Sequence, residues 1–283
     1  MNLTNYHSHS TYCDGSAPLK DFVEEAIAQG FTSYGFSSHA PLPFSTNWNM
    51  ERDQVDNYLA ECNDLVNRYQ EQIELYVGLE IDYLTEGYNP SIPFFMDLPL
   101  DYRIGSVHFI QLESGEYIDL DSGEEKFREN VESHFNGDYE EPVIRYFEAK
   151  SKMISAGGFD ILGHCDKVSK NASACAKGIC QSSFYGNILR NYLEHIAQSG
   201  CMVEINSKAY DQRGMFFPNE EHFAMMRELE IPVVVNSDSH KPALINSGRT
   251  EALKALVRAR FDTVMELKNK EWVAIPIHSK YRI

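Results

Sequence analysis

The chain has no apolar segment that is long enough to cross a membrane. Hydrophobic residues make up 43% of its 283 residues, but their longest runs fall well short of the roughly 18 residues that a spanning helix needs. Its N-terminus also lacks a basic region followed by an apolar core, so we expect no signal peptide. With a composition ordinary for globular proteins, these absences predict a cytoplasmic protein that does not bind a membrane.

Paired cysteine motifs are absent too. Cys175 and Cys180 are too far apart for a C-x-x-C motif, and no paired framework links the others. Reduced thiols in the cytoplasm are the simplest interpretation. The six scattered cysteines are Cys13, Cys62, Cys165, Cys175, Cys180 and Cys201.

Basic residues are scarce relative to acidic ones. The chain has 25 Lys and Arg against 42 Asp and Glu, and its formal net charge is −17. A long polyanion binds best to a basic surface, because such binding releases counterions, so we expect no nucleic-acid partner. A small anionic substrate remains compatible, since local cations and metal ions can outweigh the overall charge.

Strands and helices alternate along the whole chain without a repeat or a linker. Ser16 is expected to cap the first helix, which Gly30 ends. About seven β/α units in succession predict one domain over residues 1–283, built as a closed or nearly closed parallel barrel. An open doubly wound sheet is the alternative. We expect strands at 3–6, 31–36, 73–77, 102–107, 159–163, 201–205 and 233–235, and further helices at 51–70, 143–156, 184–199, 219–228 and 248–259.

Three polar segments interrupt this alternation. Residues 112–137 are acidic, and we interpret them as an excursion over the fold, partly helical at 124–133, and as a candidate lid. His134 lies within this excursion and is expected at the surface. Residues 168–180 and 206–217 are expected to be loops.

Histidines and carboxylates follow the C-terminal ends of the predicted strands. His7 and His9 alternate along the first strand, so both leave one face, about 6.6 Å apart along the chain. In a parallel barrel, catalytic residues gather at this end. The other residues at the same rim are His39, Glu80, His108, His164, Asp238 and His240.

These ligands predict a metal site with more than one ion. A single histidine at a strand end is usually structural, but such residues recur here at six strands. Four ligands satisfy one zinc-like ion, so eight or nine imply two or three ions, with Glu80 able to bridge. Because no thiolate is needed, iron, manganese and zinc are all acceptable.

The segments around these residues resemble the PHP (polymerase and histidinol phosphatase) superfamily of metal-dependent phosphoesterases. Within it, the chain resembles the stand-alone histidinol-phosphatases of histidine biosynthesis. That family has a distorted (β/α)7 barrel, which agrees with the units counted above. The segments that carry the resemblance are 6–16, 36–43, 78–83, 101–109, 159–164 and 236–240.

The resemblance implies how the metal ligands are shared. Glu80, Asp238, His240 and Asp14 would be catalytic, and hydrolysis of L-histidinol phosphate would proceed by attack of a metal-bridging hydroxide on phosphorus. The implied sets are His7, His9, Glu80 and Asp238 for one ion, Glu80, His108 and His164 for a second, and Asp14, His39 and His240 for a third.

A cation should hold the remaining phosphate oxygens. Arg213 is the first choice, because a guanidinium binds phosphate with two parallel hydrogen bonds, and Lys208 and Arg249 are rivals. Two other functions stay open. One is a PHP phosphoesterase for another small phosphate ester or a nucleic-acid end. The other is a non-catalytic metal-binding protein, which would lack ligands that are all present here.

Overall fold

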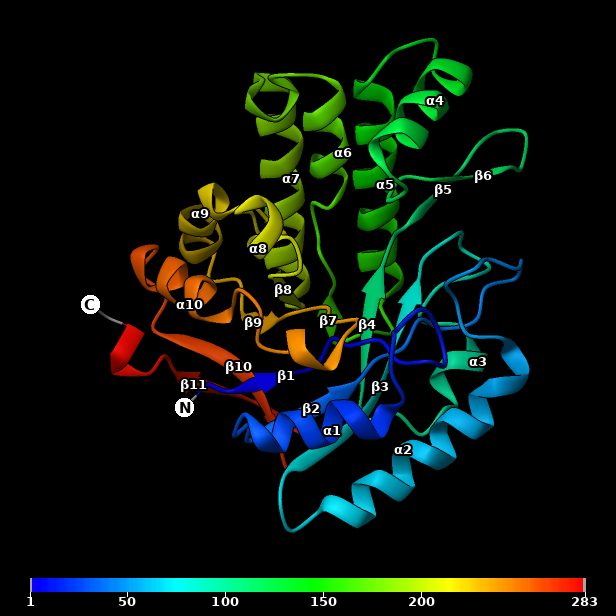
Figure 1. Cartoon of the computed structure of the whole chain (residues 1–283). Coiled ribbons are helices and arrows are strands. Elements are labelled where there is room, and N and C mark those ends of the chain that lie inside the picture. Colours follow the sequence, from blue (N-terminus) through cyan, green and yellow to red (C-terminus); the bar gives the residue numbers. More distant parts are fainter. Residues whose placement is uncertain (1, 282–283) are drawn as a thin grey trace.

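A computed structural model of the chain describes residues 2–281, and its centre is a nearly closed barrel of parallel strands (Figure 1). Every neighbouring pair in the seven-stranded sheet is parallel. A parallel bridge between Ser8 and Ser239 also joins the two ends of the sheet, so the prediction of a barrel is confirmed over the open sheet. The strands lie in the order β1 (Thr4–Asn5), β2 (Ser33–Phe36), β3 (Glu74–Asp82), β4 (Tyr102–Ser106), β7 (Ile161–Leu162), β8 (Met202–Asn206) and β9 (Val233–Asn236).

Two asparagine side chains bring the first strand beside the last. The backbone N–H of Tyr6 donates to Asn236 Oδ1 at 2.8 Å, and the N–H of Ser237 donates to Asn5 Oδ1 at 2.7 Å. Backbone hydrogen bonds between residues 7–9 and 239 then continue this seam just beyond both strands. The seam places the segment of His7 and His9 next to the segment of Asp238 and His240.

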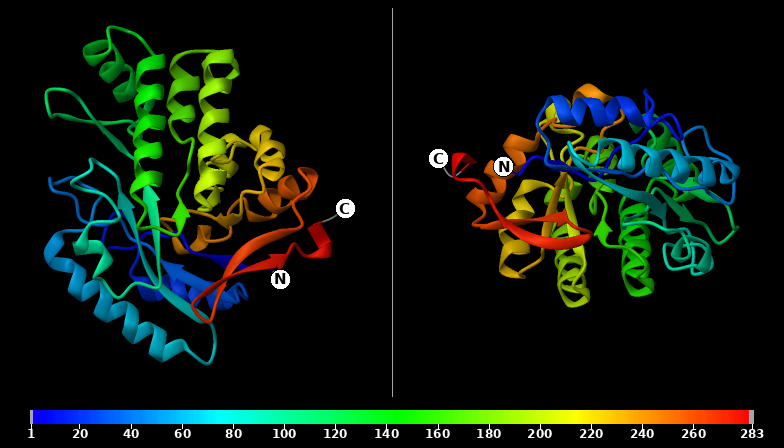
Figure 2. Two further views of the ribbon diagram at one scale, coloured as in Figure 1. Left: turned by 180° about the vertical axis from the view of Figure 1, so that it is seen from behind. Right: turned by 90° about the horizontal axis from the view of Figure 1, so that it is seen from below.

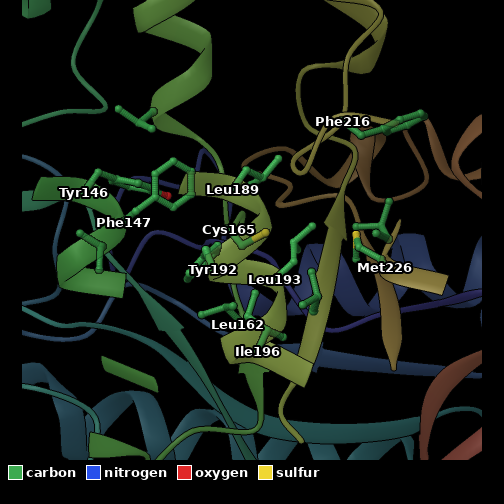
Figure 3. Close-up of a cluster of buried hydrophobic side chains, with 14 of the residues drawn as sticks. Tyr146, Phe147, Leu162, Cys165, Leu189, Tyr192, Leu193, Ile196, Phe216 and Met226 are labelled. Atoms are coloured by element: carbon green, nitrogen blue, oxygen red, sulfur yellow. The ribbon is translucent and has the colours of Figure 1, made fainter. Parts of the chain in front are cut away.

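Helices cover the outside of the barrel. Ser182 caps α7 by accepting a hydrogen bond from the N–H of Tyr185, and Gly200 ends that helix with a left-handed φ of 73°. Figure 3 shows side chains from α5 and α7 packed together with β7 in one large core. The helices outside the barrel include α1 (Leu19–Ala28), α2 (Val55–Tyr69), α5 (Glu140–Ala156), α7 (Ser183–Ser199), α9 (Phe223–Glu228) and α10 (Arg249–Arg258).

The barrel interior is filled by aromatic side chains. The hydroxyl of Tyr102 donates to the carbonyls of Tyr6 and Phe36, so its ring spans the space between strands. Gly35 and Gly78 make room for this side chain, because a Cβ on Gly35 would lie 2.3 Å from its hydroxyl oxygen and a Cβ on Gly78 would lie 2.5 Å from its Cζ. A hairpin of β10 (Thr263–Lys268) and β11 (Glu271–Pro276) packs against this core through Trp272 (Figure 2).

A hairpin and two helices were not predicted, whereas a helix within residues 112–137 was. The excursion at 112–137 contains part of a hairpin, β5 (Phe109–Gln111) and β6 (Tyr117–Asp119), followed by α4 (Glu124–His134), and His134 is exposed as expected. The two expected loops contain α6 (Val168–Cys175) and α8 (Tyr210–Arg213). A short helix, α3 (Pro93–Met96), precedes β4 at a place where the sequence also indicates one. None of the helices within residues 2–281 combines the length and apolarity needed to cross a bilayer.

Candidate metal centre

The Glu80 carboxylate lies at the centre of a buried histidine cluster. Glu80 lies near the C-terminal end of the long strand β3. Its Oε2 lies 2.9 Å from His39 Nδ1, 3.1 Å from His7 Nε2 and 3.5 Å from His9 Nε2. Its Oε1 lies 2.8 Å from His164 Nε2. One carboxylate therefore contacts four histidine nitrogens that come from three separate segments of the chain.

The nine predicted ligands all converge on this place. The ligand atoms of each possible group lie within 4.8 Å of one another. Most members are buried, whereas Asp14 and His240 are more accessible. The groups are His9, Asp14, His39 and His240; His7, His164 and Asp238; His7, His9 and Glu80; and His39, Glu80 and His108.

Four of these polar atoms are buried without a hydrogen-bond partner. They are His7 Nε2, His9 Nε2, His39 Nδ1 and Glu80 Oε2. Leaving buried polar atoms unpaired is costly, and metal ions would satisfy all four at once. A set of imidazole nitrogens and carboxylate oxygens suits divalent transition metals. The residues therefore fit a metal centre.

Two further carboxylates orient the histidines. Glu204 Oε1 lies 2.6 Å from His7 Nδ1, which turns His7 Nε2 toward Glu80, and Asp82 Oδ1 lies 2.9 Å from His108 Nδ1. Such contacts fix the ring orientation of metal-binding histidines. Glu204 was not predicted, although a glutamate between Val203 and Ile205 in a fully buried strand was a signal of its role.

The turn that carries Asp14 is unusually tight. A Cβ on Gly15 would lie 2.0 Å from the carbonyl oxygen of His9, so only glycine lets the chain fold back here. Ser16 does not cap the first helix, because its hydroxyl donates instead to the carbonyl of His240 at 2.9 Å. This bond holds Asp14 beside His240, whose Nε2 lies 3.2 Å from Asp14 Oδ2.

Comparison with known proteins decides the family. Residues 5–208, well over half of the chain, match the family model described as the PHP domain. The chain belongs to the PHP domain family. The resemblance of its motifs to this superfamily is therefore confirmed.

Relatives and solved structures agree with this placement. A histidinol-phosphatase from Bacillus subtilis is 27% identical over 85% of this chain and 94% of its own length. A probable histidinol-phosphatase from Schizosaccharomyces pombe is 26% identical over 83% of this chain and 80% of its own. A Lactococcus lactis histidinol phosphate phosphatase, solved with zinc, L-histidinol and phosphate, has a TM-score of 0.73 at 21% identity, over 96% of this chain and 99% of that one.

The carboxylates of this PHP domain are held in their charged form. Burial raises the pKa of Glu80, but the charges of His7, His39 and His108 outweigh it and keep that pKa well below its usual range. Asp238 has a lowered pKa for a similar reason, because Lys208 and His7 offset its burial. Both carboxylates are thus poised to bind cations at neutral pH.

A cavity of about 330 Å³ opens onto the centre. Of the three predicted phosphate-binding residues, the structure brings only Lys208 to it, with its Nζ 3.1 Å from Asp238 Oδ1. Arg213 is exposed and pairs with Glu124, and Arg249 is buried elsewhere, where it donates to a backbone carbonyl of β9. The lining residues are Asp14, His39, Asn47, Trp48, His108, Asp119, Asp121, Ser122, Lys167, Lys208, Asp238 and His240.

Lys167 is a second cation in this cavity and was not predicted. Its side chain is nearly buried, and its Nζ lies 2.7 Å from Asp121 Oδ2. Sequence spacing could not identify it, because its partner Asp121 lies in the distant excursion at 112–137, just before α4.

Proposed function

We propose that this PHP domain hydrolyses L-histidinol phosphate to L-histidinol and phosphate. The observation that carries the proposal is the position of Glu80, whose two carboxylate oxygens lie among buried histidine nitrogens beside a cavity that also contains lysines. The names of the curated relatives support this substrate. The reaction would belong to histidine biosynthesis in the cytoplasm.

The centre would hold two to three divalent ions of zinc, iron or manganese. One ion would be held by His7, His9 and Asp238, a second by His108 and His164, and both would also be held by Glu80. The remaining ligands, Asp14, His39 and His240, would hold a third ion. Bound ions would supply an activated water and neutralise charge on the phosphoryl oxygens. The histidines keep their orientation because Glu204 and Asp82 occupy their outer nitrogens.

The side chains of the chain itself would bind and orient the substrate. Lys208 and Lys167 border the cavity, and their ammonium groups would hold the phosphate oxygens. Glu80 and Asp238 would hold the ions and thereby orient the attacking water. Asp14 and His240 also border the cavity, and their side of the centre would stabilise the leaving alkoxide or help to protonate it.

Metal analysis and a substrate panel together test this function. Protein purified without chelator should contain two to three ions per chain. It should hydrolyse L-histidinol phosphate much faster than nucleotides or sugar phosphates. Equal and poor rates on every ester would remove the biosynthetic assignment, and a protein that binds no metal would contradict the site itself.

The Glu80→Gln variant tests the mechanism. Losing a charge that serves two ions should lower kcat/KM by about a hundredfold or more, the effect of several kcal/mol in the transition state. Glu71→Gln makes the same chemical change at an exposed glutamate and is the matched control. Unchanged circular dichroism of both variants would show that the fold is intact. If Glu80→Gln kept most of its activity, the shared-carboxylate mechanism would be wrong.

A further inference from the structure

Residues 119–122 form a rigid part of the cavity wall. The backbone carbonyl of Asp119 accepts a hydrogen bond from Asn130 Nδ2 at 3.2 Å. The carbonyls of Leu120 and Ser122 both accept from Asn171 Nδ2, at 3.0 and 2.5 Å. Both asparagines are buried. The cavity-facing end of the excursion is therefore anchored to α4 and α6.

This anchoring holds the Asp119 carboxylate in one position. Its Oδ1 accepts hydrogen bonds from the backbone N–H groups of Asp121 at 2.8 Å and Ser122 at 3.0 Å. The carboxylate also borders the cavity beside the metal ligands. It is thus placed before any substrate arrives, which lowers the entropic cost of binding.

Asp119 differs from its neighbour Asp121 in its ion pairs. Asp121 lies 2.7 Å from Lys167 Nζ and 3.9 Å from Lys170 Nζ. Among residues 2–281, no ion pair to Asp119 is formed by a lysine, arginine or histidine side chain. Burial, together with the nearby charge of Asp121, outweighs the opposing charge of His108 and raises the pKa of Asp119, so a further cation beside it would be favourable.

The indole of Trp48 lines the same cavity and is supported by other aromatic rings. Trp48 stacks on Phe109 with an interplanar angle of 11° and lies 4.5 Å, between ring centroids, from His39. Phe44 stacks on Tyr117 of the hairpin in the same way. These contacts join the loop at 41–50 to the β5–β6 hairpin, so Trp48 and Asp119 belong to one continuous wall.

The cavity therefore offers two kinds of chemistry. His39 Nδ1, buried and without a hydrogen-bond partner, marks the side that suits metal ions and phosphate, with Lys167 and Lys208 nearby. Asp119 and Trp48 provide an anionic and an apolar group, neither of which suits a phosphate. They suit the organic part of an ester that carries a positive charge.

We propose that Asp119 determines specificity by binding a cationic nitrogen in the alcohol portion of the phosphate ester, with Trp48 covering the apolar portion. The site would thus select cationic alkyl phosphates over neutral and anionic esters. This inference rests on the proposed function and adds the basis of its substrate choice. Asp119 itself is not placed among the metal ligands.

The test measures how one substitution changes kcat/KM for two different phosphate esters. Asp119→Asn should lower kcat/KM for L-histidinol phosphate by about tenfold to a hundredfold, since a hydrogen bond to a charged group is lost. It should leave kcat/KM for neutral phenyl phosphate unchanged. Glu116→Gln removes an exposed charge from the same hairpin and is the matched control. Metal content is measured for each variant, because a structural role would lower it.

Two further esters identify the nitrogen. Leucinol phosphate keeps the ammonium group without the imidazole, and 3-(imidazol-4-yl)propyl phosphate keeps the imidazole without the ammonium. The ester whose turnover still depends on Asp119 carries the recognised cation, and either result supports the proposal. An equal loss for every ester, phenyl phosphate included, or no loss for any of them, would overturn it.

Failure of this inference can be told apart from failure of the proposed function. If the unsubstituted protein prefers L-histidinol phosphate over phenyl phosphate and Asp119→Asn keeps that preference, only the role of Asp119 is wrong. If the unsubstituted protein shows no such preference, the proposed substrate is wrong.

Discussion

His7 Nδ1 and Glu204 Oε1 lie 2.6 Å apart, although 197 residues separate them in the chain. Both side chains are fully buried. Glu204 also accepts hydrogen bonds from the backbone N–H of His164 and from the side chain of Asn236. One carboxylate thus orients two metal-ligating segments and ties β8 to β9, so it supports the centre without facing the cavity.

Glu204→Gln should weaken metal binding. The amide keeps the size of the side chain but removes the charge that holds the His7 ring, and loss of such a contact typically costs about tenfold to a hundredfold in metal affinity. Competition with a chromogenic chelator measures this change. Glu71→Gln should leave the affinity as it is, and the same affinity in Glu204→Gln would contradict the orienting role.

Lys208→Met and Arg213→Met separate two candidates for the phosphate-binding cation. Only Lys208 borders the cavity, so its substitution should raise KM for L-histidinol phosphate by about tenfold or more, as expected for a lost charged hydrogen bond. Arg213 is exposed and pairs with Glu124, so Arg213→Met should change KM little. Steady-state kinetics measures both. A larger effect at Arg213 would return the role to that residue.

Gly78→Ala should destabilise the fold. A Cβ at this position would lie 2.5 Å from Cζ of Tyr102, whose ring fills the barrel interior, and overpacking of this kind costs about 1–3 kcal/mol. Urea unfolding measures the free energy of unfolding. At Gly123 a Cβ would meet nothing within 4 Å, so Gly123→Ala is the control. Equal stability of the two variants would show that Tyr102 has room to move.

Lys150 should make stability depend on alkaline pH. Its ammonium is fully buried and donates to the carbonyl of Gly163, and burial lowers its pKa to about 8. The unfolded chain holds this proton up to about pH 10.5, so the penalty for burying the charge is present below pH 8 and is relieved as pH rises.

The comparison that isolates Lys150 uses Lys150→Met. Between pH 7 and pH 10, the unsubstituted protein should gain roughly 2 kcal/mol of unfolding free energy relative to the variant. Urea unfolding at both pH values provides the measurement, and the variant cancels the other groups that titrate in this range. A constant difference between the two proteins would mean that Lys150 keeps an ordinary pKa.

The convergence of the nine candidate ligands could be predicted from the sequence, because each candidate stands in a recognisable local segment. His7, His9 and Asp238 stand at the ends of apolar segments, and in a parallel barrel those ends must meet at one rim. The hairpin of β5 and β6 could not be recognised in the same way. Its strands are only three residues long, and their alternation is hidden among acidic residues.

The residues that surround the candidate ligands could not be predicted from the sequence, because their positions depend on contacts between distant segments. Lys167 borders the site because Asp121 lies beside it, and Arg249, an equally plausible cation in the sequence, is buried against β9. Ser16 had the position of a helix cap, but the seam of the barrel brings the carbonyl of His240 within its reach.

The sequence by itself determined the barrel class and predicted the nine residues that the structure brings together, because strand periodicity and the order of the segments are local properties. Only the tertiary structure decided which carboxylates orient the histidines, which lysines reach the cavity, and that Asp119 forms no ion pair with any side chain of residues 2–281. Those choices depend on distances between segments far apart in the chain, which are set only when the barrel closes between β1 and β9.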